Sequence, residues 1–313
     1  MISLLTSLKP FNGKASSLQE KALGNWRRLD PNLEIIIYGG GDGIAERAHR
    51  FGARHITDIR GNAKGIPDFS AIVEHATLNA LYDFQVYLNG DILLPPNFIQ
   101  QVENVDFRQY LIVGQRIDLS EAAIFNPLTI AWTEEIRRSV SAGQAQLHNP
   151  AGQDYFVFPR GLWNGLKPLI VGRGGYDNAL IAYCLRRKIP IIDATWDIHA
   201  VHQWHDYSHV NGAAETFAGV DALANARRHD IEHSNPDIED AGWRLIDGKL
   251  IPCHGSANPF RQLEVLLRYR WGLKYPSYLC RAITRTAWLG GWLNPRELLV
   301  ESVIRGESKK SIG

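Results

Sequence analysis

An acidic residue interrupts one of the most apolar short stretches of the chain. The stretch YLNGDILL covers residues 87–94, and its strand-like pattern breaks at Asn89, Gly90 and Asp91. A carboxylate at a strand end, with Asn89 two residues before it, can hold a divalent cation such as Mg²⁺ or Mn²⁺ against a diphosphate, because these hard cations prefer oxygen ligands. Gly-Asp is also turn chemistry, and for the stretch taken alone a turn or helix-cap aspartate is the favoured interpretation.

A second acid, Asp177, follows a run of glycines and begins a predicted helix, Asp177–Arg187. The helix dipole stabilises an anionic side chain at that position. An anionic carboxylate in a crevice is a candidate general base. A simple helix cap is the alternative, and caps are far more common than catalytic bases.

Four histidines recur at intervals of three, three and four: His199, His202, His205 and His209. On a helix they would share one face and could form a metal cluster, but the segment follows a strand and favours extended chain. With Trp204 among them, they also fit a sugar pocket, where aromatic faces stack on the rings. A structural zinc site would lack thiolates, and buried core histidines are a further alternative. We expect one or two of them at most to act directly.

The glycines at positions 39–41 do not form a dinucleotide-binding motif. After Gly39 and Gly41, the place of the third glycine is taken by Ile44. The sequence therefore excludes a nicotinamide or flavin site of that type.

The composition is that of an ordinary globular protein. The chain has 313 residues, 45% of them hydrophobic and 21% charged, with a net charge of +1. A charge so close to zero does not favour nucleic acid as a partner. Three scattered cysteines without a CxxC pair predict a reducing, cytoplasmic compartment. The first residues lack the basic-then-apolar order of a signal peptide, and no stretch approaches the roughly 20 apolar residues of a membrane span.

The first hundred residues alternate predicted strands and helices. This alternation predicts an α/β fold with a mostly parallel, doubly wound central sheet and helices on both faces. Ligands of such sheets bind beyond the carboxyl ends of the strands, where Asp91 lies. The predicted strands are Ile2–Thr6, Glu34–Tyr38, His55–Ile59 and Tyr82–Leu88; the helices are Ser17–Leu29, with a capping box at its start, Ile44–Phe51 and Asp68–Leu81.

The second half is less regular and ends in a basic segment. Asp247-Gly248 predicts a hairpin within Trp243–Ile251. Residues 258–313 hold ten Lys or Arg against four Asp or Glu. We therefore expect a domain over residues 1–255 and a basic, Trp-containing helical extension over 256–313. The extension fits helical structure packed on the domain with a solvated basic face, which we favour, or a segment that binds an anionic membrane surface or a lipid-linked acceptor. Further strands are predicted at Leu111–Val113, Tyr155–Phe158 and Ile189–Ile192.

Taken in order, the segments over about residues 1–215 resemble the GT-A glycosyltransferases, the fold that includes glycosyltransferase family 2. Asn89-Gly90-Asp91 is similar to the family's Asp-x-Asp metal motif, with asparagine in the first place. The stretch GYDNALIAYCLRRKIPIIDATWDIHAVH resembles the family's acid-opened helix, with its basic end, the next strand and a histidine. The resemblance implies a Rossmann-like GT-A fold.

The resemblance also implies a metal-assisted hexosyltransferase in polysaccharide biosynthesis. It would move a sugar from a nucleotide diphosphate sugar to a glycan or lipid-linked acceptor, in the cytoplasm or on a membrane reached through 258–313. Asp91 and His202 would hold Mn²⁺ or Mg²⁺. Asp177 would be the base of an inverting reaction, with Asp154 as a second candidate acid. The implied donor-binding residues are Thr6, Asp42, Lys64, Asp68, Asn89 and Asp91.

Two alternatives remain open at this point. Asn89, in place of the usual acid, favours a glycan- or nucleotide-binding module without turnover. The histidines of residues 199–209 favour a metal hydrolase, for which bound zinc would be the evidence.

Overall fold

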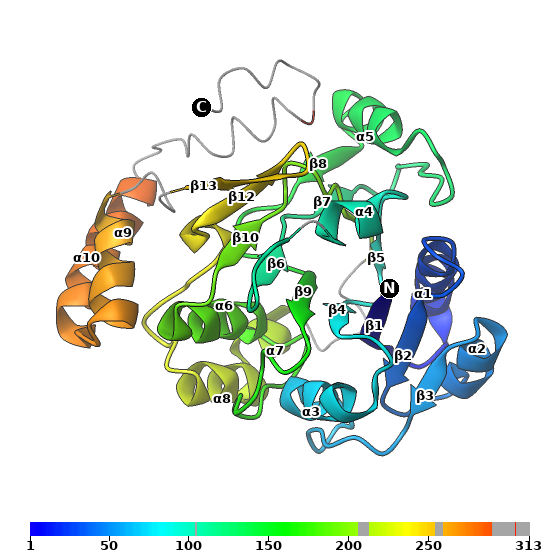
Figure 1. Ribbon diagram of the computed structural model, residues 1–313, viewed down its shortest axis with the longest axis horizontal. Coiled ribbons are helices and arrows are strands. Elements are labelled where there is room, and N and C mark those ends of the chain that lie inside the picture. The colour runs from blue at the N-terminus through cyan, green and yellow to red at the C-terminus, as the bar shows by residue number, and fades with distance from the viewer. Residues whose placement is uncertain (104, 206–212, 254–258, 290–303, 305–313) are drawn as a thin grey trace.

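The computed structural model describes residues 1–103, 105–205, 213–253, 259–289 and 304 (Figure 1). A nine-stranded sheet with the order β3-β2-β1-β4-β9-β6-β10-β12-β13 forms the centre of the molecule. Its strands are β1 (Ile2–Ser7), β2 (Glu34–Tyr38), β3 (Arg54–Ile56), β4 (Phe84–Leu88), β6 (Leu111–Val113), β9 (Tyr155–Pro159), β10 (Ile191–Asp193), β12 (Trp243–Ile246) and β13 (Lys249–Pro252).

The central sheet is mostly parallel, as the alternation of elements predicts. β9 is antiparallel to both of its neighbours, β4 and β6. β13 is antiparallel to β12, and the remaining neighbouring pairs are parallel. Because β9 is reversed, its first residues lie at the edge of the sheet where β4 and β6 end.

A second, four-stranded sheet has the order β5-β11-β7-β8 and was not predicted from the sequence. It packs into the same apolar core as one face of the central sheet. The pairing of β5 with β11 joins the chain just after Asp91 to the histidine segment. Its strands are β5 (Ile92–Leu93), β7 (Ile117–Leu119), β8 (Ala145–Leu147) and β11 (Val201–His202).

Two apolar clusters cover the two faces of the central sheet, since successive strand residues such as Leu4 and Leu5 point to opposite sides. The first cluster contains α1 (Gly13–Arg27), α2 (Ile44–Arg50), α4 (Phe98–Glu103) and α5 (Trp132–Ser141). The second contains α3 (Phe69–Asn79) and α6 (Tyr176–Arg187). Helices on both faces confirm the predicted layers (Figure 1).

Most predicted boundaries hold to within a few residues, and the start of α1 is the main error. The helix begins at Gly13, and its cap residue Asn12 makes no side-chain capping bond. The predicted capping box at Ser16 and Ser17 is therefore wrong. The hairpin prediction is confirmed, because Asp247 and Gly248 have φ angles of 51° and 70°, the left-handed pair of a type I′ turn.

The described part of the extension is helical, as predicted, and packs against α6. The Arg186 guanidinium of α6 lies 5.3 Å from the centre of the Tyr269 ring. The predicted boundary at residue 255 lies outside the described residues. No helix among the described residues is long and apolar enough to cross a membrane. The remaining helices are α7 (Ala213–Ala218), α8 (Val220–Arg228), η1 (Ile238–Asp240), α9 (Pro259–Val265), η2 (Leu266–Arg270) and α10 (Lys274–Leu289).

Candidate metal and catalytic site at the carboxyl edge of the sheet

Three chain segments meet where the parallel strands end. Residues 89–91 follow β4, and residues 116–118 lie just beyond β6. The reversed strand β9 begins at the same edge, so Gln153 and Asp154 arrive there from the other direction. This edge is where open α/β sheets bind their ligands.

Asp91, His202 and His205 form a group that can hold a metal ion. Each offers one ligand atom, and the three atoms lie within 4.8 Å of one another. Asp91 Oδ2 lies 3.2 Å from His205 Nε2 and 3.7 Å from His202 Nε2. Asp91 Oδ1 is buried without a hydrogen-bond partner among the described residues. Two imidazoles and a carboxylate with a spare oxygen fit a divalent cation such as Mn²⁺ or Zn²⁺.

Backbone hydrogen bonds fix the histidine segment beside Asp91. His202 pairs with Ile92 in the antiparallel contact of β11 with β5. The Gln203 backbone N–H then donates to the Asp91 carbonyl oxygen at 3.2 Å. Its side-chain amide donates to the Leu18 carbonyl oxygen at 2.9 Å. The backbone of His202 and Gln203 is therefore fixed beside Asp91.

Electrostatics keep the Asp91 carboxylate ionised. Burial raises the pKa of Asp91, but His202 and His205 outweigh it and hold the pKa well below its ordinary value. Burial lowers the pKa of His202, but Asp91 and Asp118 outweigh it and raise the pKa above its ordinary value. The carboxylate is thus an anionic oxygen donor.

Asp118 stands behind the metal group and was missed by sequence reasoning. Its Oδ1 lies 3.2 Å from His202 Nδ1, and its Oδ2 lies 2.6 Å from His148 Nδ1. Burial raises the pKa of Asp118, but the two histidines and Arg116 outweigh it and lower the pKa. No periodic pattern in the sequence links positions 118, 148 and 202.

Asp154, predicted as a second catalytic acid, is engaged on both carboxylate oxygens. The Asn89 amide donates to Oδ1, and Arg116 donates to Oδ2. Its backbone oxygen also accepts a hydrogen bond from the Asn89 N–H at 3.0 Å. This geometry makes Asp154 a support for the Asn89 turn, and its catalytic role stays a prediction.

Asp177 lies in the first turn of α6, as predicted. Its Oδ1 accepts the Asn178 N–H at 3.0 Å, and its Oδ2 accepts the Gln153 N–H at 3.3 Å. Because Gln153 precedes Asp154, the carboxylate borders the same polar cluster. Burial raises the pKa of Asp177, while the backbone N–H donors partly oppose that rise. A raised pKa suits a group that must accept a proton near neutral pH.

Two of the six predicted donor-binding residues, Thr6 and Asp68, are buried and make hydrogen bonds within the fold. Thr6 is fully buried, and its hydroxyl donates to the Leu88 carbonyl oxygen at 2.9 Å. Asp68 caps α3, where its carboxylate accepts hydrogen bonds from the Ser70 and Leu169 N–H groups. Neither side chain belongs to the metal group, and donor binding by them stays a prediction.

Two further predicted donor-binding residues, Asp42 and Lys64, are exposed. Asp42 lies in the loop after β2. Lys64 is paired with Glu215, with 3.0 Å between Nζ and Oε1. Both can reach a ligand from solvent, and their roles also stay predictions.

Of the four histidines, two belong to the metal group and one lies in the core. His202 and His205 come from a strand and the residues after it, as the expected extended chain predicts. His199 is buried, and its carbonyl oxygen accepts a hydrogen bond from the Trp132 indole at 2.9 Å. His209 lies outside the described residues.

Lys9 adds positive charge within electrostatic reach of Asp91, and Arg173 lies within electrostatic reach of Lys9. Desolvation lowers the pKa of Lys9; Asp91 opposes the shift and Arg173 adds to it. Both charges therefore lie within electrostatic reach of the Lys9 ammonium. Lys9 comes two residues after the end of β1, at the edge of the sheet where ligands bind. This position in the sequence could have identified it as a candidate site residue.

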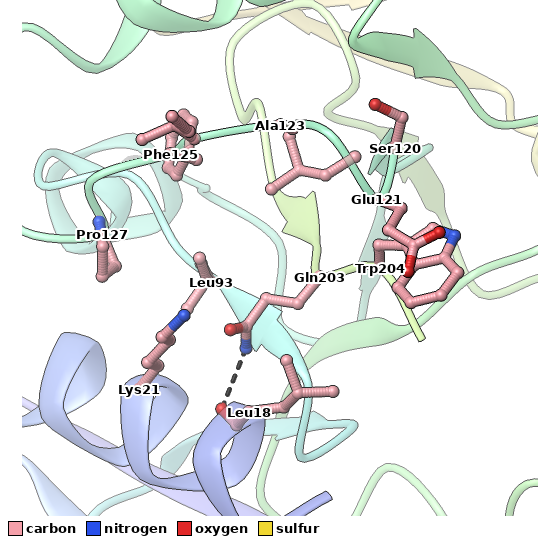
Figure 2. A pocket seen from close by; sticks show the side chains of 12 residues that line it. Leu18, Lys21, Leu93, Ser120, Glu121, Ala123, Phe125, Pro127, Gln203 and Trp204 are labelled. Atoms are coloured by element: carbon pink, nitrogen blue, oxygen red, sulfur yellow. Dashed lines mark hydrogen bonds between the residues drawn. The ribbon is translucent and has the colours of Figure 1, made fainter. Parts of the chain in front are cut away.

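A pocket of about 380 Å³ lies beside the histidine segment (Figure 2). Trp204, between the two histidine ligands, forms part of its wall, and Figure 2 shows Gln203 bonded to Leu18 next to it. Polar and apolar side chains both contribute to the lining. The lining residues are Leu18, Lys21, Leu93, Leu119, Ser120, Glu121, Ala123, Ile124, Phe125, Pro127, Gln203 and Trp204.

No family model matches the sequence, and no curated protein matches it. Solved structures similar to the chain include three sugar transferases. The mannosyltransferase PcManGT from Pyrobaculum calidifontis, in complex with GDP-Man and Mn²⁺, is 16% identical, with 96% of this chain and 79% of its own covered, at a TM-score of 0.45. TarS 1-349 from S. aureus, in complex with UDP-GlcNAc, is 10% identical in sequence. The match covers 74% of this chain and 66% of the TarS chain, with a TM-score of 0.48.

Glucosyl-3-phosphoglycerate synthase from Mycobacterium tuberculosis, in complex with Mn²⁺, uridine-diphosphate and phosphoglyceric acid, is the third. It is 14% identical, with 73% of this chain and 78% of its own covered, at a TM-score of 0.43. With scores and identities this low, the function proposed below rests on the site itself.

Proposed function

We propose that the protein transfers a sugar from a nucleotide diphosphate sugar to a hydroxyl acceptor. The observation that carries the proposal is the group of Asp91, His202 and His205 at the carboxyl edge of the sheet. Asp177, a half-buried acid whose pKa is raised above its ordinary value, borders the same polar cluster. A cation site and a base are the two parts that such a transfer needs.

Different residues are proposed to bind the diphosphate of the donor and the cation beside it. Asp91, His202 and His205 would hold a divalent cation, which would supply electrostatic stabilisation for the charge on the leaving diphosphate. Lys9 and Arg173 attract the same diphosphate through their charge. Asp91 supplies the anionic ligand, because its pKa lies far below neutral pH.

Asp177 acts on the acceptor. Its ionised carboxylate accepts the proton of the attacking hydroxyl, and attack from the face opposite the diphosphate inverts the anomeric carbon. The backbone N–H groups of Gln153 and Asn178 hold the carboxylate in one orientation. The donor is proposed to carry a hexose, as in polysaccharide synthesis. A cytoplasmic location is proposed because the three cysteines are free.

The direct test is a thermal-shift screen of nucleotide sugars with and without Mn²⁺. A ligand at a hundredfold of its Kd stabilises the native state by about 2.7 kcal/mol. That stabilisation raises the melting temperature by about 5 °C or more. We expect such a rise for one nucleotide sugar in the presence of Mn²⁺ and a smaller one in EDTA. No shift across UDP-, GDP-, ADP- and CDP-sugars would contradict the proposal.

The pocket beside Trp204 is proposed as the acceptor subsite. It adjoins the metal group, because Trp204 lies between two of its ligands. An aromatic ring suits a sugar face, and Ser120 and Glu121 can bond hydroxyl groups. Leu93 and Phe125 add an apolar wall for an alkyl or lipid portion.

Trp204→Ala is expected to raise the acceptor KM about tenfold, because the stacking surface is lost. The Kd of the nucleotide sugar should stay within about twofold of the parent, since the metal ligands remain. Trp271→Ala is the matched control, because this tryptophan is 62% exposed on the helical extension. Transfer to alkyl glycosides and oligosaccharides, measured at saturating donor, gives the KM. An unchanged acceptor KM would remove the pocket from the reaction.

One observation favours a second function, that of a zinc hydrolase. Two histidines and a carboxylate are also a catalytic zinc set, with a fourth position for water. Elemental analysis of protein purified without added metal separates the two functions. Stoichiometric zinc without nucleotide-sugar binding supports the hydrolase, whereas a nucleotide-sugar hit supports the transferase.

A binding module without turnover is favoured by Asn89. Its amide is bonded to Asp154, where the resembled motif carries an acid. Tight nucleotide-sugar binding with neither transfer nor donor hydrolysis across an acceptor panel would support this function.

A further inference from the structure

Asp118 lies behind one ligand of the metal group without belonging to it. β7 and β11 run parallel, and their register sets Asp118 opposite His202. Asp118 Oδ1 is 3.2 Å from Nδ1 of that histidine. The other ring nitrogen, Nε2, is 3.7 Å from Asp91 Oδ2. The two nitrogens of one imidazole therefore face two different carboxylates.

When the ring is neutral, this arrangement favours the tautomer with its proton on Nδ1, because the Asp118 carboxylate lies nearer than that of Asp91. A neutral imidazole has one N–H donor and one lone-pair acceptor, and its partners decide which nitrogen carries the proton. With its N–H directed from Nδ1 to Asp118, His202 presents the Nε2 lone pair toward Asp91 and the cation position. A carboxylate behind a ligating histidine fixes both the tautomer and the orientation of the ring.

Asp118 is itself held in place from two sides. Its Oδ2 is 2.6 Å from Nδ1 of His148. Arg116 donates from Nε to Oδ1 at 2.8 Å, and its other arm binds Asp154. The flanking strands β8 and β11 pair with β7 on either side. A carboxylate with partners on both oxygens can hold a ring more firmly than a solvated one.

We propose that Asp118 is a positioning residue, which fixes His202 so that Nε2 is its ligand atom for a divalent cation such as Mn²⁺. The role rests on the cation site of the proposed function and extends that site to a residue outside the group of Asp91, His202 and His205. Imidazole suits transition metals better than Mg²⁺, so Mn²⁺ is the metal to test.

The first measurement is Mn²⁺ affinity of the full chain without nucleotide, from the electron paramagnetic resonance signal of free Mn²⁺. Asp118→Ala is expected to raise the Kd about 10- to 100-fold. Asp118→Asn should recover part of the loss, because its carbonyl oxygen still accepts the Nδ1–H. Asp106→Ala is the matched control, since it removes an exposed carboxylate that precedes β6, at the opposite edge of the sheet. Its Kd should stay at the parent value.

The second measurement identifies the protonated nitrogen of the neutral His202 ring by ¹⁵N spectroscopy of metal-free protein, at a pH above the raised pKa of that histidine. The parent and Asp118→Asn should show the Nδ1–H form. Asp118→Ala should lose it, which a purely structural role for the carboxylate would not require.

The outcomes separate this role from the proposed function. A folded Asp118→Ala variant with the parent's Kd and tautomer overturns the positioning role, even if the parent binds Mn²⁺ and a nucleotide sugar. A parent protein that binds no Mn²⁺ overturns the cation site and this role together. If Asp118→Ala does not fold, the Asp118→Asn variant provides the test. An Asn variant whose His202 ring carries its proton on Nε2, with Mn²⁺ affinity equal to the parent's, overturns the role.

Discussion

Asp91→Asn is expected to lower sugar transfer at least 1,000-fold while the protein stays folded. The change keeps the shape of the side chain but removes the anionic oxygen that faces both histidines. Cation stabilisation of a developing charge contributes several kcal/mol, and each 1.4 kcal/mol is a factor of about ten in rate. The Mn²⁺-dependent thermal shift with nucleotide sugar should disappear as well.

Asp106→Asn is the matched control for this change. Asp106 is exposed and precedes β6, so it lies at the opposite edge of the sheet from the site. Its variant should bind Mn²⁺ and transfer sugar like the parent. If Asp91→Asn transfers sugar at the parent rate in assays with chelator-treated protein and added Mn²⁺, Asp91 does not hold the cation.

Asp177→Asn is expected to lower the transfer rate about 100- to 10,000-fold, the usual contribution of a general base. The Kd of the nucleotide sugar should change little, because Asp177 touches neither the metal group nor the basic side chains. The asparagine oxygen can still accept one of the two backbone N–H groups that now bond the carboxylate. The fold should therefore be retained.

The pH dependence of the parent's transfer rate provides an independent test of Asp177 as the base. Burial raises the pKa of Asp177 above its ordinary value, and only the ionised form accepts a proton. Transfer by the parent should therefore fall as the pH falls through that raised pKa, at a higher pH than an exposed aspartate would show. At Mn²⁺ concentrations that keep the metal group saturated, the residual activity of Asp177→Asn should lack this acidic limb. A parent-like rate in this variant, with loss in Asp154→Asn instead, would move the base to Asp154.

Elements with a strong local pattern could be predicted from the sequence. The run EIIIY is buried throughout as β2, since both faces of a parallel sheet are covered by helices. Asp247-Gly248 needed only its own two residues to specify the hairpin turn. Local signals of this kind do not depend on distant segments.

Elements set by distant contacts could not be predicted. The strands of the small sheet have only two or three residues, too few for any period to appear. The reversal of β9 depends on pairing with β4 and β6, which no local pattern records. For the same reason, Asp118 and His148 were missed. Asp91 stood out against its apolar surroundings, and His202 belonged to the histidine-rich run.

The pairing of β5 with β11 determines when the cation site can form during folding. Gln203 and Asp91, which it holds together, are 112 residues apart in the chain. Closing so long a loop is entropically unfavourable until the intervening sheet has formed. A nascent or truncated chain that stops before β11 would carry the aspartate yet lack both imidazoles. Metal affinity should therefore emerge late in folding, and manganese uptake during refolding would report completion of the tertiary structure.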